Sequence, residues 1–142
     1  MKKESIHQLA DKTVSSSTVN TLLEKEKKAQ ISFSIRLKDK MYFVLVDNIA
    51  FIFLEGDTVY LIDFKGEKHI ISKTLDALEK AIPTQQFYRI NRQMIVNRQA
   101  IKDVETYPNQ RKVVHLTIVP TPEDAIVPRA KVKPFLSWIE KG

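Results

Sequence analysis

The residues best suited to chemistry in this chain lie between positions 87 and 97, where the sequence reads FYRINRQMIVN. The polar side chains of this run are Arg89, Asn91, Arg92, Gln93 and Asn97. Arginine, asparagine and glutamine make bidentate hydrogen bonds to the edges of guanine and adenine in the major groove. The apolar residues on both sides of the run are expected in the core, where they would anchor it at the surface. The pattern therefore predicts a surface loop that reads DNA.

Composition and charge favour one folded domain with a polyanionic partner. The 142 residues are 43% hydrophobic, which is enough for one core, and the formal net charge is +6. Lysine and arginine release condensed counterions when they neutralise phosphates. Cysteine is absent, which excludes disulfides, thiolate metal sites and thiol catalysis. No apolar run reaches the roughly 18 residues that span a bilayer, so we expect a cytoplasmic protein with no membrane partner.

An enzyme is the main alternative from another class, and the sequence gives it little support. The three histidines, His7, His69 and His115, lie far apart and lack the spacing of metal ligands. Glycines occur only at positions 56, 66 and 142, so the chain has no Gly-rich loop that could hold a phosphate. We expect no enzymatic activity, no cofactor and no bound metal.

Residues 1–30 differ from the rest of the chain. They are mostly polar and include the mixed charge cluster EKEKK at positions 24–28. Val19, Leu22 and Leu23 are spaced like one face of a short amphipathic helix. A segment of this composition cannot bury enough apolar surface to offset the entropy lost on ordering. It predicts a linker or disordered tail, and a docked N-terminal helix is the alternative.

From residue 31 onward, apolar residues alternate with polar ones, which predicts β-strands. The expected strands span residues 31–37, 41–46, 49–54, 59–64, 68–71, 101–107, 112–119 and 125–127. A surface loop is expected at residues 120–124, which include two prolines. One helix is expected between Ser72, as its cap, and Pro83, and a second at the C-terminus with Pro134 in its first turn. The pattern predicts a mainly β domain over residues 31–142, with small antiparallel sheets, one short internal helix and a C-terminal helix.

Three motifs occur in one order along this domain: EGDTVY at positions 55–60, the run at 87–97 and VPR at 127–129. Together they resemble the LytTR family, the DNA-binding output domain of many bacterial response regulators. The resemblance covers about residues 33–140. The chain departs from the family pattern at Asn91, usually a histidine, at Gln93, usually a serine, and at Pro128, usually a serine. Because Pro128 has neither a backbone donor nor a hydroxyl, we expect a different operator sequence.

The resemblance implies an elongated, LytTR-like arrangement of small antiparallel sheets that reads DNA through loops instead of a recognition helix. Carried onto this sequence, the candidate base contacts are Arg92, Arg129, Asn91, Gln93, Asp57 and Thr58. Arg92 and Arg129 are favoured, because a planar guanidinium matches the two acceptors of guanine. Asp57 is acidic and can only accept from cytosine or position a neighbour.

The basic residues around these positions are candidates for phosphate contacts, which set the register on DNA without carrying sequence information. They are Arg89, Arg98, Lys102, Lys131 and Lys133. The alternative for each lysine is a solvated surface charge, which is the commoner fate of this residue type. The alternative for Arg89 is an ion pair with Glu55 or Asp103.

We therefore interpret the chain as a domain that binds specific double-stranded DNA and controls transcription in a two-component system. The family implies an N-terminal receiver domain, absent before Ile31, whose phosphorylation promotes a homodimer on repeated half-sites. The alternative function is a basic antiparallel-sheet module that binds a protein or RNA. RNA-binding sheets expose stacking aromatics, whereas aromatics make up only 8% of this chain and fall at expected core positions.

Overall fold

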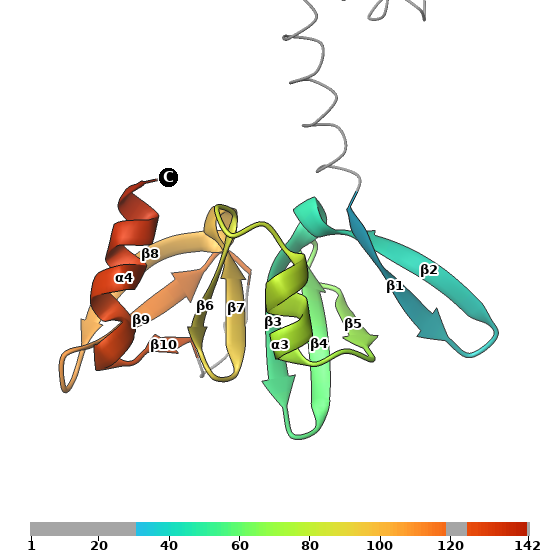
Figure 1. Cartoon of the computed structure of the whole chain (residues 1–142), viewed down its shortest axis with the longest axis horizontal. Coiled ribbons are helices and arrows are strands. Elements are labelled where there is room, and N and C mark those ends of the chain that lie inside the picture. The colour runs from blue at the N-terminus through green and yellow to red at the C-terminus, as the bar shows by residue number, and fades with distance from the viewer. Residues whose placement is uncertain (1–30, 119–124, 142) are drawn as a thin grey trace, which may run out of the picture.

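Three antiparallel sheets lie in a row along the longest axis of the molecule (Figure 1). The computed structural model describes residues 31–118 and 125–141. The sheet at one end consists of β1 (Ser32–Leu37) and β2 (Lys40–Leu45). The central sheet has the order β5 (Lys68–Ile71), β4 (Thr58–Asp63), β3 (Ile49–Glu55), β7 (Met94–Asn97) and β6 (Phe87–Asn91). The third sheet has the order β10 (Ile126–Val127), β9 (Arg111–Leu116) and β8 (Ile101–Tyr107).

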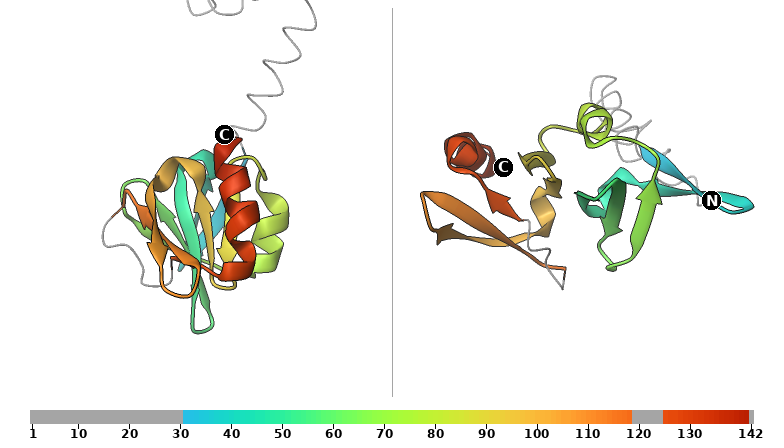
Figure 2. Two further views of the ribbon diagram at one scale, coloured as in Figure 1. Left: turned by 90° about the vertical axis from the view of Figure 1, so that its left-hand side faces the viewer. Right: turned by 90° about the horizontal axis from the view of Figure 1, so that it is seen from below.

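The described helices are α3 (Leu75–Ala81) and α4 (Arg129–Glu140). Figure 2 shows both on the same side of the row of sheets, with their axes running in nearly the same direction. This arrangement confirms the expected class, which was a mainly β fold with small antiparallel sheets, one short internal helix and a C-terminal helix. The linker expected at residues 1–30 and the loop expected at 120–124 lie outside the described residues. Within the described ranges, no helix is both long enough and apolar enough to cross a bilayer.

The central sheet is covered on both faces, because alternate side chains along its strands enter two separate cores. One core joins it to β1, β2 and α3, and includes Phe33, Ile35, Ile52, Leu61, Leu75 and Leu78. The other joins it to the third sheet and α4, and includes Phe51, Ile90, Met94, Val114, Val127 and Phe135. Burial on both faces gives this sheet close-packed side chains on each side.

Residues 87–97 fold as a β-hairpin, so the prediction of a loop was wrong. Phe87 pairs with Asn97 and Asn91 pairs with Met94, which leaves only Arg92 and Gln93 in the turn. Asn97, expected at the surface, is fully buried, and its Nδ2 donates to the carbonyl of Ile49 at 2.8 Å. The strand β7 lies between β3 and β6 with a core on each face, so its sequence lacks the alternation that reveals a half-buried strand.

Both helices begin at residues other than the expected ones. Thr74 caps α3 in place of Ser72, and its Oγ1 accepts from the backbone nitrogen of Ala77 at 3.1 Å. The helix α4 begins at Arg129, so Pro134 lies inside it and not in its first turn. A proline inside a helix has no backbone N–H, so the carbonyl four residues before it loses its helical hydrogen bond. Pro134 is exposed, so water can donate to that carbonyl instead.

A chain of hydrogen bonds joins the two-stranded sheet to the central one. The ring of His69 lies between Tyr42 of β2 and Asp63 of β4, with Nδ1 2.8 Å from the tyrosine hydroxyl and Nε2 2.9 Å from Oδ2. Oδ1 of Asp63 accepts from the backbone nitrogens of Lys65 and Glu67. Burial raises the pKa of Asp63, but these hydrogen bonds outweigh burial and lower the pKa overall.

We predict that this chain of hydrogen bonds makes the fold sensitive to acid. Because the folded-state pKa of Asp63 lies below 3.8, its contribution to stability is complete above pH 3.8 and is lost as the pH falls through the folded-state pKa. Asp63→Asn should therefore lower stability at neutral pH and flatten the further loss in acid. Urea unfolding across this pH range measures both effects, with Asp39→Asn in the exposed β1–β2 turn as the control. An Asp63→Asn protein as acid-sensitive as the wild type would contradict the prediction.

Candidate nucleic-acid interface

The three segments that carry candidate base contacts lie on one edge of the molecule. In Figure 1 the β3–β4 turn, the β6–β7 turn and the start of α4 all point to the lower side. Asp57 and Thr58 belong to the first segment, Arg92 and Gln93 to the second, and Arg129 to the third. All of these residues are exposed except Thr58, which is half-buried. The edge therefore presents hydrogen-bonding side chains from three different elements.

Arg92 and Arg129 lie on neighbouring segments of this edge. Arg92 lines a shallow groove together with Pro128 and Lys131, and Arg129 follows Pro128 as the first residue of α4. Among residues 31–118 and 125–141, neither guanidinium has a hydrogen-bond or ion-pair partner. Both fork-shaped groups are thus available to an external acceptor, as recognition of a base edge requires.

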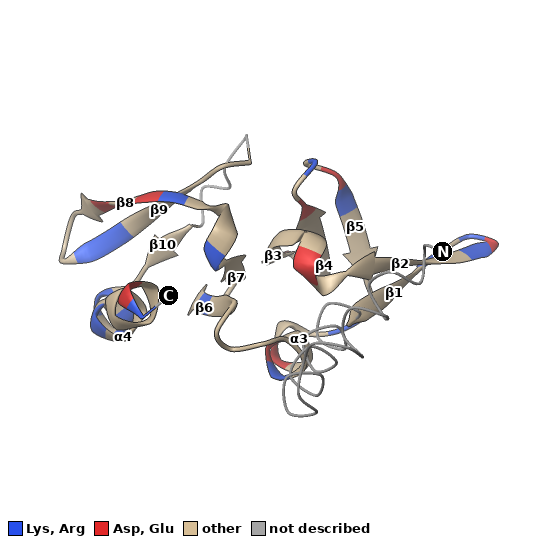
Figure 3. Cartoon of the chain, turned by 90° about the horizontal axis from the view of Figure 1, so that it is seen from above, with Lys and Arg blue, Asp and Glu red and all other residues tan. Residues whose placement is uncertain are grey.

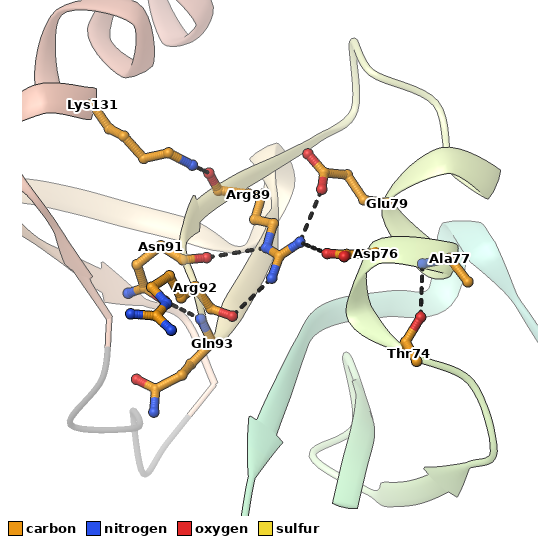
Figure 4. A network of polar contacts seen from close by, with 9 residues as sticks. All are labelled: Thr74, Asp76, Ala77, Glu79, Arg89, Asn91, Arg92, Gln93 and Lys131. Atoms are coloured by element: carbon orange, nitrogen blue, oxygen red, sulfur yellow. Dashed lines mark hydrogen bonds and ion pairs between the residues drawn. The ribbon is translucent and has the colours of Figure 1, made fainter. Parts of the chain in front are cut away.

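Arg89, which lies on β6 three residues before Arg92, is bonded inside the protein (Figure 4). Its Nη1 donates to the carboxylates of Asp76 and Glu79 on α3. Its Nε donates to the carbonyl of Asn91 at 3.2 Å, and its Nη2 donates to the carbonyl of Arg92 at 2.8 Å. The guanidinium therefore connects the backbone of the β6–β7 turn to α3.

These contacts favour the second of the two expectations for Arg89, an ion pair within the protein. The ion-pair partners are Asp76 and Glu79, not Glu55 or Asp103, and the side chain is only 18% exposed. The hydrogen bond from Arg89 lowers the pKa of Asp76, so that carboxylate stays ionised at neutral pH. The geometry supports a structural arginine that positions the turn, in place of a phosphate contact.

Asn91 joins the same turn to the third sheet. Its Nδ2 donates to the carbonyl of Ile126 on β10 at 2.8 Å, and its Oδ1 accepts from the backbone nitrogen of Gln93 at 2.8 Å. Both ends of the side-chain amide are therefore used within the protein. This geometry supports a role in shaping the turn and in holding it beside β10, the strand that leads into α4.

Two more of the expected phosphate contacts make bonds inside the protein. The Nζ of Lys131 on α4 donates to the carbonyl of Arg89 at 2.9 Å. Arg98 donates to the carbonyls of Gln85 and Ile139, and its guanidinium lies 4.1 Å from the centre of the Trp138 ring. Lys131 therefore connects α4 to β6. Arg98, which follows β7, connects the end of α4 to Gln85, just before β6.

Lys102 on β8 and Lys133 on α4 are exposed, as a phosphate contact requires. Arg111 and Lys112 were not among the predicted contacts. They lie at the tip of the β8–β9 hairpin, which is near the start of α4 in Figure 1. Arg111 lies over the ring of Tyr107 at 4.9 Å and donates to the carbonyl of Pro108 at 2.9 Å. The signal for this tip was a pair of basic residues directly after the turn Pro108-Asn109-Gln110.

Acidic residues lie close to His69 and His115 in space, although spacing along the sequence did not predict this. Ligand atoms of Asp63, Glu67 and His69 lie within 4.8 Å of one another, and a second group contains Asp103, Glu105 and His115. Both ring nitrogens of His69 already take part in hydrogen bonds, and Nδ1 of His115 bonds to Asp103. These contacts account for both groups as links between strands.

We predict that Arg89 acts through the shape of its hydrogen-bonding group and not through its charge. Arg89→Lys keeps the charge but cannot donate to two carboxylates and two carbonyls at once. It should lower the free energy of unfolding by about 1 to 2 kcal/mol and weaken DNA binding without changing the salt dependence. Urea unfolding and DNA titration at several salt concentrations measure this. Arg36→Lys, at an exposed position of β1, is the control, and wild-type stability in Arg89→Lys would contradict the assignment.

Comparison with known proteins agrees with the order of motifs and with the fold. The family described as LytTr DNA-binding domain matches residues 39–140, and no curated protein sequence matches significantly. Among solved structures, the chain resembles the LytTr DNA-binding domain of a response regulator from Bacillus cereus, with a TM-score of 0.64 and 16% identity. That match covers 76% of this chain and 95% of the other. The structural likeness concerns the fold, and the family match over most of the sequence establishes that this chain belongs to the LytTR family of DNA-binding domains.

Proposed function

We propose that this LytTR domain recognises a specific double-stranded DNA sequence and controls transcription as the output domain of a bacterial response regulator. The observation that carries the proposal is the pair of exposed arginines, Arg92 and Arg129, on neighbouring segments of one edge. A guanidinium fork matches the O6 and N7 acceptors of guanine in the major groove. Two such forks on one edge suit the reading of nearby bases in the same duplex.

The residues around these arginines divide into two groups. Gln93 and Thr58 offer further hydrogen-bonding groups toward bases, and Lys133 offers a charge toward phosphates. Lys102 is exposed, but it lies near the start of β8, at the end of β7 away from the β6–β7 turn, so it is not part of this edge. Arg89, Asn91, Arg98 and Lys131 hold the turn and α4 in place through the contacts described above. This division revises the sequence-based assignment of the second group, since their polar atoms already have partners in the protein.

The charge distribution on α4 supports the same orientation toward DNA. Its first five residues include Arg129, Lys131 and Lys133, and its first turn contains no acidic residue. Figure 3 shows the basic positions along α4, whose acidic residue, Glu140, is the last residue of the helix. The +6 formal charge of the chain adds a general attraction to phosphates.

Regulation by an N-terminal receiver domain completes the proposal. Phosphorylation would promote a homodimer, and two linked domains would then occupy repeated half-sites with higher avidity than one. The family is one of DNA-binding domains and not of enzymes, so the proposal needs no catalytic residue.

Selection of bound sequences from a random duplex pool tests the function directly. Enrichment of a defined motif is the expected result. Equal recovery of all duplexes, or tighter binding to RNA of random sequence, would contradict the proposal and favour a different basic module.

We predict that Arg92→Ala and Arg129→Ala each reduce affinity for the selected motif by about 1 to 3 kcal/mol. Each should also abolish discrimination at one base position, because a bidentate contact is lost. Titrations over all single-base variants of the motif measure this, with Arg36→Ala as the control for loss of a charge away from the edge. Equal losses on every sequence would show that the two arginines contact phosphates.

We also predict that Lys133→Ala weakens binding to all sequences alike. Removing one phosphate contact should reduce the slope of log K against log salt by about 0.9. The matched control is Lys38→Ala, an exposed lysine in the β1–β2 turn at the other end of the domain. An unchanged slope in Lys133→Ala would remove this residue from the interface.

A further inference from the structure

The hairpin of β1 and β2 exposes a row of large apolar side chains. Met41, Phe43 and Leu45 are 47%, 65% and 41% exposed, and they share one face of β2 because they are two residues apart. We call these three residues the apolar stripe. Between them, Tyr42 and Val44 turn to the opposite face, where Val44 is buried in the core.

The apolar stripe lies on a surface that the described residues leave uncovered. β2 pairs only with β1 among the described strands, so its outer edge is open. Single exposed apolar residues are common, but a contiguous group on one face indicates a surface that takes a partner. In Figure 1 this hairpin lies at the opposite end of the molecule from α4, so the stripe is separate from the proposed DNA-binding edge.

The chain itself supplies an apolar segment next to the stripe. Residues 1–30, which lie outside the described part, connect to Ile31, whose carbonyl accepts from the backbone nitrogen of Val46 at 2.8 Å. Ser32 pairs with Leu45, so this segment joins the domain at one end of the stripe. Val19, Leu22 and Leu23 have the i, i+3, i+4 spacing of an apolar helix face.

The connection is long enough for this segment to reach the whole stripe. The eight residues from Leu23 to Ile31 span up to about 27 Å when extended, whereas the stripe from Leu45 to Met41 measures about 14 Å at the usual rise of a strand. A segment held this close has an effective concentration on the order of millimolar. A second copy of the chain would need a similar, millimolar concentration in solution to compete for the apolar stripe.

We propose that Val19, Leu22 and Leu23 dock on the apolar stripe of the same chain and cover Met41, Phe43 and Leu45. Docking at this end leaves Arg92 and Arg129 open to DNA. It also fixes the path of the chain where it enters the domain.

The absence of cysteine allows a direct test in the full chain. Thr18→Cys with Ser34→Cys places one thiol beside the docking segment and one on the stripe face, because Ser34 pairs with Phe43. The control pair is Thr18→Cys with Leu37→Cys, since Leu37 is 50% exposed but lies on the other face of the hairpin. The rate of disulfide formation is measured in dilute protein, and mass spectrometry separates monomers from linked dimers.

The Ser34 pair should close within one chain at least about tenfold faster than the Leu37 pair. Adding Phe43→Ser to the Ser34 pair should remove that difference, and because Phe43 is exposed this change leaves the core intact. Equal rates for the two pairs, or no effect of Phe43→Ser, would overturn the proposal. Linked dimers as the main product would assign the stripe to a second copy instead.

Discussion

The guanidinium of Arg89 is the contact on which the arrangement of the proposed interface depends. It binds two carboxylates of α3 on one side and two carbonyls of the β6–β7 turn on the other. The carbonyl of the same residue accepts from Lys131 of α4. One strand residue therefore connects both helices to the turn. Charge-assisted hydrogen bonds of this kind are stronger than neutral ones and fix direction as well as distance.

Within the proposed function, this connection explains how a turn serves in place of a recognition helix. A base contact requires its side chain to start from a backbone held within a fraction of an ångström. In this domain the turn of Arg92 and Gln93 ends a hairpin whose inner strand, β7, is covered on both faces. Core packing holds the hairpin, and Arg89 with Asn91 holds the last residues that the core does not reach. The packed β6–β7 hairpin therefore carries the short exposed turn directly at its end.

The sequence predicted those parts of the fold in which a pattern lies within a few neighbouring residues. Alternation placed β1 and β2 nearly correctly, because each has one face against a core. The strand β3, which is covered on both faces, was placed as an apolar run between the polar turns at residues 47–48 and 55–57. Alternation did not reveal β7, because Met94, Ile95 and Val96 are all buried. These residues were therefore predicted to be core residues next to a polar loop. The partners of Arg89 were also missed, because Asp76 and Glu79 meet it only through the packing of α3 on the central sheet.

The same reasoning applies to the positions where this chain departs from its family. Asn91 bonds to Ile126 and Gln93, and Pro128 precedes Arg129 with a fixed φ of −67° and no side-chain cap. All three departures, Asn91, Gln93 and Pro128, lie where the β6–β7 turn meets the start of α4. Changes there alter how one guanidinium is placed relative to the other without removing either. Within the proposed function, the expectation of a different operator therefore rests on the spacing and direction of the two guanidinium groups, and not on the loss of a base contact at Asn91 itself.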